Sequence, residues 1–175
     1  MKNLFLLIFF ILISFEIHAQ NWRPNFAIPL GSESMATSNN QKLNEYLEQH
    51  VPWHRPGNCE SELSVFTFRV NSRGGIDSMD VDGNLNKDVA AQIVKNIYKT
   101  EGKWKIPDNT KAGDKCWFVY PFFLFGNISP CTDEKRAAFY QLLSLYHIYS
   151  GSFDIADNRG RVILAPNSFA KLSEK

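Results

Sequence analysis

The segment from residue 63 to residue 125 constrains the fold of this chain most strongly. Leu63–Val70 is rich in β-branched and aromatic residues that largely alternate, and Ile76–Val81 carries apolar residues at positions 76, 79 and 81. The turn residues between the two runs include Gly74 and Gly75. This order of strand residues, turn residues and strand residues predicts a β-hairpin.

Two further elements follow the hairpin in the same segment. Asn86–Lys99 repeats apolar residues four positions apart, as one face of a helix requires. Cys116–Phe125 is almost continuously aromatic or aliphatic, and its aromatic residues together with Pro121 favour a strand over a buried helix. The segment therefore predicts the order strand, strand, helix, strand.

Three pieces of this segment resemble the TonB carboxy-terminal domain family. Phe68–Ile76 is similar to the first hairpin of that family, in which a phrase F-x-V-D-x-x-G-x-I/V recurs. Trp104–Pro107 looks like the W-x-P that follows the helix, with one extra residue, and Phe118–Phe125 resembles the last strand, with a proline in its middle. The order and the spacings agree over residues 63–125, and the resemblance does not cover the residues after 126.

We expect an α+β fold in which a small three-stranded antiparallel sheet, with strand order 2-1-3, is packed by a helix. The periodicity of Asn40–Val51 predicts a preceding helix. Apolar spacing after Thr132 predicts a C-terminal helix ending at Gly151, and residues 152–157 and 161–165 predict a short terminal hairpin. The expected divisions are a signal peptide, a flexible lead, a TonB-like domain and a helix and hairpin extension, at residues 1–19, 20–39, 40–126 and 127–175.

The strand order leads to a cysteine pairing. Cys59 precedes the first strand and Cys131 follows the third, so both lie at the same edge of a 2-1-3 sheet, whereas Cys116 begins the third strand at the opposite edge. We therefore predict a Cys59–Cys131 disulfide and a free Cys116. Closing so long a loop is expected to stabilise the fold by roughly 4 kcal/mol in the chain-entropy model.

The first residues predict export from the cytoplasm. Lys2 precedes an apolar run from Leu4 to Phe15, and Ala19 offers a small residue for cleavage. The expected mature protein begins at Gln20, is periplasmic or secreted, and has no membrane association after cleavage. The alternative is an uncleaved amino-terminal anchor helix. The net charge of +1 and the absence of a long basic run give no indication of nucleic-acid binding.

The sequence contains no convincing catalytic or metal-binding motif, so we expect neither an enzyme nor a cofactor. His50, His54 and Cys59 suggest a metal site, but Pro52 breaks the helical spacing of the two histidines and no second ligand pair follows. Asp77, Asp80 and Asp82 lie along the second strand and the turn after it, yet no calcium-loop spacing surrounds them. We interpret them as part of a solvated strand face.

The resemblance implies a protein-binding module. TonB-like domains capture an extended segment of an outer-membrane transporter as an added strand at the edge of the sheet. The third strand is the expected edge, and the residues expected to bind the partner are Cys116, Trp117, Phe118, Val119, Tyr120, Pro121, Phe122 and Phe123.

Energy transduction is not expected, because the lead from Gln20 to Asn40 spans at most about 70 Å and lacks a Pro/Lys repeat. Two alternatives remain open: an anchored energy transducer, and a small-ligand carrier with an aromatic groove formed by Trp53, Trp104 and Trp117. We also consider a homodimer.

Overall fold

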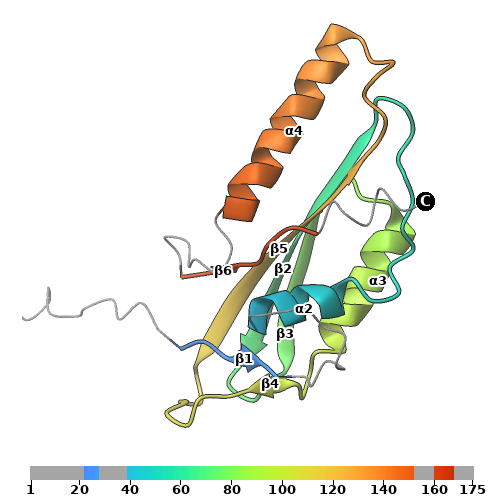
Figure 1. The fold of residues 1–175 in the computed structure, drawn as a ribbon. Coiled ribbons are helices and arrows are strands. Elements are labelled where there is room, and N and C mark those ends of the chain that lie inside the picture. Colours follow the sequence, from blue (N-terminus) through green and yellow to red (C-terminus); the bar gives the residue numbers. More distant parts are fainter. Residues whose placement is uncertain (1–21, 28–38, 152–159, 168–175) are drawn as a thin grey trace, which may run out of the picture.

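The computed structural model describes residues 22–27, 39–151 and 160–167 and has the expected α+β fold (Figure 1). In chain order, its elements are β1 (Asn25–Phe26), α2 (Asn39–Leu47), β2 (Ser61–Asn71), β3 (Ile76–Gly83), α3 (Lys87–Tyr98), β4 (Trp104–Lys105), β5 (Lys115–Phe125), α4 (Asp133–Gly151) and β6 (Val162–Ile163).

The main sheet has the strand order β3-β2-β5-β6. β2 pairs antiparallel with β5 along its whole length, from Ser61 opposite Phe125 to Asn71 opposite Lys115. β3 pairs antiparallel with the other side of β2. The predicted order 2-1-3 is therefore confirmed for β3, β2 and β5, and β6 adds a fourth strand parallel to β5 that the prediction lacked.

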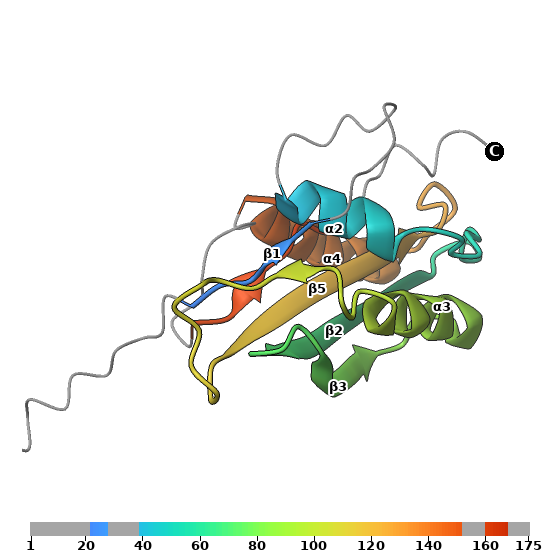
Figure 2. The same cartoon turned by 90° about the horizontal axis from the view of Figure 1, so that it is seen from below.

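Helices cover both faces of the sheet. One face, which we call the front face, carries the even-numbered side chains of β2 and β5 and packs against α2 and α3 (Figure 2). Phe68 and Phe118 stack on this face with ring centroids 5.3 Å apart. On the opposite, back face, Phe123 and Phe125 contact aromatic rings of α4. The alternation of a strand thus supplies two aromatic layers from one sheet.

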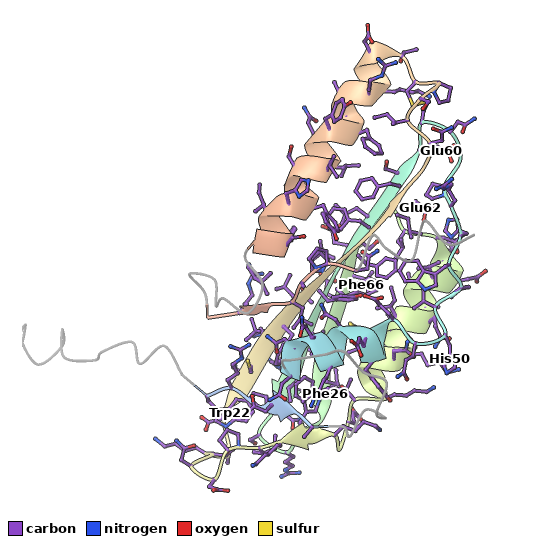
Figure 3. All side chains as sticks on the ribbon, in the orientation of Figure 1. Trp22, Phe26, His50, Glu60, Glu62 and Phe66 are labelled. Carbon is purple, nitrogen blue, oxygen red and sulfur yellow. A yellow bond between two sulfur atoms is a disulfide. The ribbon has the colours of Figure 1, made fainter. Side chains whose placement is uncertain are left out.

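Residues 22–27 of the expected flexible lead pack against the domain, which corrects that prediction for these six residues. Trp22 and Phe26 are buried members of the front core, and Figure 3 shows both near α2 at the lower end of the sheet. β1 pairs antiparallel with β4, and the ring of Phe26 lies 5.5 Å from that of Trp104. Two large buried rings explain why this short segment is fixed.

One arm of the predicted terminal hairpin, residues 161–165, contains β6, which pairs with β5, and the hairpin itself stays a prediction. Val162 pairs with Phe118 and Ile163 with Val119, both in β5. The other predicted arm, residues 152–157, lies outside the described residues. A strand of two residues carries too little periodicity to reveal its partner in the sequence.

The Cys59–Cys131 disulfide is confirmed, with a Cα–Cα distance of 5.4 Å, and Cys116 is free and buried. The two loops that the disulfide joins are also held by a backbone hydrogen bond, in which Cys59 N donates to Asn127 O at 2.9 Å. Gly126 is required at this crossing, since a Cβ there would overlap the carbonyl oxygens of Gly57 and Glu60.

Replacing both bridged cysteines, as Cys59→Ser with Cys131→Ser, should lower the free energy of unfolding by roughly 4 kcal/mol, because the unfolded chain regains the entropy of a 72-residue loop. Urea unfolding monitored by circular dichroism measures the change. Ser129→Ala, an exposed change in the same loop, is the control. A double variant as stable as the unmodified protein would contradict this expectation.

Candidate functional site

The candidate site is the edge of β5 that faces away from β2. In a strand, the N–H and C=O of one residue point to the same side, and successive residues alternate. Leu164 N donates to Val119 O at 2.8 Å, and Phe123 N donates to Asn167 Oδ1 at 2.6 Å. The odd-numbered residues of β5 therefore direct their backbone polar groups to this outer edge.

Pro121 lies between these two contact points on the outer edge. By the same alternation, its missing N–H would have faced away from β2, so the proline removes no donor from the β2–β5 ladder. Pro121 stands opposite Val65 without a register shift in that ladder. This position explains how a proline is accommodated in the middle of the longest pairing in the fold.

The chain's own C-terminal segment, residues 160–167, occupies the outer edge. Beyond the pairing of β6, Asn167 uses its side-chain amide like a strand residue, accepting from Phe123 N and donating from Nδ2 to Phe123 O at 2.8 Å. Two helices hold the segment from outside, because Asn44 Nδ2 donates to Ala165 O and the Tyr146 hydroxyl donates to Asn167 O.

The prediction that β5 is an open edge is therefore corrected. Seven of the eight expected partner-binding residues are buried, and Trp117 alone is half-buried. Cys116, Phe118, Tyr120 and Phe122 belong to the front core. Val119, Pro121 and Phe123 are buried as well, and Phe123 packs against Tyr146 and Tyr149 of α4. Helices on both faces explain this, and a partner at this edge would meet backbone groups rather than aromatic pockets.

The aromatic groove expected for a small-ligand carrier is not formed. Trp104 is buried between Phe26 and Phe118, whereas Trp53 packs on Phe122 further along the front face. Trp117 lies beneath the guanidinium of Arg69, 5.1 Å from its carbon Cζ. A pocket of about 190 Å³ does exist, but polar residues line it: Arg23, Asn25, Asn39 and Asn40.

No metal site forms from the described histidines, cysteines and acidic residues, among which no group of three converges. His54 Nε2 lies 3.0 Å from Glu62 Oε1, and Glu62 Oε2 accepts from the backbone of Asn86. His50 is well separated from Glu62 (Figure 3). Cys59, the third candidate ligand, is in the disulfide.

Two buried ionisable groups of β5, Cys116 and Tyr120, are held in their neutral forms. Burial raises the pKa of the Cys116 thiol to about 11, so this sulfur is held in its unreactive protonated form. Burial and, next, the nearby charge of Glu48 raise the pKa of Tyr120 well above its ordinary value. Both effects favour neutral side chains in the core rather than an activated nucleophile or base.

Comparisons with models of known protein families, with curated proteins and with solved structures find no match for this chain. Within the residues that the structure describes, no helix combines the length and the apolar composition needed to cross a membrane.

We expect Cys116 to resist alkylation by iodoacetamide in the folded protein. With a pKa of about 11, roughly one thiol in a thousand is ionised at pH 8, and the rate should rise about tenfold for each pH unit up to pH 10. Mass spectrometry of the labelled peptide follows the reaction. The protein unfolded in guanidinium without reductant is the control and should react at least 100-fold faster at pH 8, because an exposed thiolate is accessible and more abundant.

Proposed function

We propose that this protein is an exported envelope module that binds other proteins, without catalysis or energy transduction. It captures an extended segment of its partner as a strand on the outer edge of β5. The resemblance of residues 63–125 to the TonB carboxy-terminal domain suggests the class of partner, a segment of an outer-membrane transporter. Location in the periplasm or outside the cell is part of the same proposal.

One observation carries the proposal: the outer edge of β5 already receives an extended segment. Residues 160–167 add to β5 through backbone bonds at Val119 and through the Asn167 amide at Phe123. The edge is therefore shaped to accept a peptide by its main chain, the contact that strand addition uses. A partner would bind by replacing this segment.

Because a partner strand must replace residues 160–167 on β5, the stability of this resident segment sets the affinity for the partner. A tethered segment competes at an effective concentration of about 1 mM, so a partner must bind more strongly than β6 or be presented at high local concentration. β6 has only two strand residues, and a longer partner strand could pair with more of the eleven residues of β5. A self-occupied edge also protects the protein from pairing with unrelated strands.

Weakening the resident segment should strengthen partner binding. Asn167→Ala removes both side-chain bonds to Phe123, and each bond contributes about 1 kcal/mol. We therefore expect peptides from the periplasmic segments of the host's outer-membrane transporters to bind about thirtyfold more tightly. Fluorescence anisotropy of labelled peptides measures the affinity. Asn109→Ala, at an exposed asparagine in the loop before β5, is the matched control.

The position of the added strand distinguishes strand addition at β5 from strand addition at β3, the other edge of the sheet. NMR shifts on peptide binding should concentrate at Val119 and Phe123 of β5. Shifts confined to Asp77–Asp82 of β3, the opposite edge of the sheet, would show that strand addition occurs elsewhere. Equal affinities of Asn167→Ala and the unmodified protein would contradict exchange at β5.

A further inference from the structure

The outer side of α4 is unusual for a helix at a protein surface. Between Arg136 and its last residue, Gly151, the helix contains no Asp, Glu, Lys or Arg. A surface helix normally carries charged residues on the side opposite its core contacts. The outer side of α4 therefore lacks charged residues after Arg136 and is available to a partner.

The exposed residues of α4 after Arg136 are uncharged, and they include the polar Gln141, Ser144 and His147 as well as three large apolar side chains. Tyr140, Leu145 and Ile148 are 55%, 41% and 61% exposed. At 100° per residue, Ile148 points away from the inner residues Phe139 and Tyr146, and the other two lie on the flanks. None of the side chains described in α4 is fully buried, so its own sheet covers the helix only partly.

A second unpartnered surface lies on the back face of the same sheet. α4 contacts β5 through Phe123 and Phe125, and β2 and β3 extend away from it (Figure 2). A helix about 10 Å wide covers about two strands spaced 4.8 Å apart, so one helix leaves half of a four-stranded face open. The open half, defined by Leu63, Val65 and Thr67 of β2 with Asp80 and Asp82 of β3, is half-buried on β2 and exposed on β3.

We propose that a second copy of this chain covers both surfaces. In a two-fold, back-to-back dimer, the outer side of each α4 packs along β2 in the open half of the other copy's back face, and Asp80 and Asp82 on the edge strand β3 stay at the solvated rim. Each surface is then the partner of the other, which is the self-complementarity that a symmetric dimer requires. This inference does not depend on the proposed function.

The dimensions suit a stable dimer. With 19 residues α4 is about 28 Å long, and the open half of the sheet is of similar length and width. Together they give each copy a flat projection of about 560 Å², and the accessible area of a ridged helix or sheet exceeds its projection. The interface thus approaches the roughly 800 Å² per partner that specific complexes bury.

A membrane surface fits α4 less well than a second copy. Helices that lie on membranes carry Lys and Arg on their polar face, and α4 has neither after Arg136. The open half of the back face also presents Asp80 and Asp82, which an anionic lipid surface would repel.

Sedimentation equilibrium of the protein, expressed from residues 1–175 and purified from its host, tests the proposal from about 1 µM to about 200 µM. We expect a monomer–dimer equilibrium in this range. Ile148→Glu and Val65→Lys, one on each surface, should each weaken dimerisation at least tenfold. Tyr98→Glu is the matched control, because Tyr98 is 45% exposed on α3, on the front side of the sheet.

Circular dichroism and thermal unfolding check that each variant is folded. Ile148→Glu should disturb the fold less than Val65→Lys, because Ile148 is highly exposed and Val65 is half-buried. A protein that stays monomeric at 200 µM would overturn the proposal, as would equal weakening by Tyr98→Glu. Co-sedimentation of the monomer with anionic phospholipid vesicles, lost in Ile148→Glu, would assign the surface to a membrane instead and would also overturn it.

Discussion

The antiparallel ladder between β2 and β5 is the interaction on which the rest of the structure depends. Its eleven residue pairs align two long strands whose side chains alternate between two faces. Phe68 and Phe118 on the front face give α2 and α3 a surface to pack on, and Phe123 and Phe125 on the back face do the same for α4. A slip of one residue would exchange the two faces of a strand, so the aromatic layers and the register fix one another.

The sequence predicts this central part well because its signals are local and strong. Alternation in β2, the helical period of α3 and the turn between β2 and β3 each depend on neighbouring residues, and the disulfide followed from the resulting strand order. β1 is not predicted, and the strand predicted at residues 161–165 lacks its pairing with β5, because each strand has two residues and depends on a distant strand for its hydrogen bonds. The position of β5 was misjudged although a signal existed: an apolar run without alternation is typical of a strand buried on both faces.

In the candidate site, too, some features are visible in the local sequence and others depend on distant residues. Its chemistry, main-chain groups at the edge of an aromatic strand, was visible in residues 116–125. Its occupant was not, because Asn167 acts as a strand residue through its side chain, and no backbone periodicity marks such a role. The role of Pro121 becomes clear only in the structure. Because backbone groups alternate along β5, the N–H that proline lacks would point to the outer edge, where the C-terminal segment lies, and not to β2.

The disulfide makes the chain between Cys59 and Cys131 a covalent ring that contains β2, β3, α3, β4 and β5. Tension applied at the two ends of the chain would pass through the sulfur atoms and bypass the β2–β5 ladder. The ring also removes 72 residues, roughly 240 Å of contour, from any extension. β1 and α2 on one side, and α4 and the segment 160–167 on the other, lie outside the ring and are not held by it. Under load, the protein would release β6 and uncover the edge of β5 while β3, β2 and β5 stay paired inside the ring.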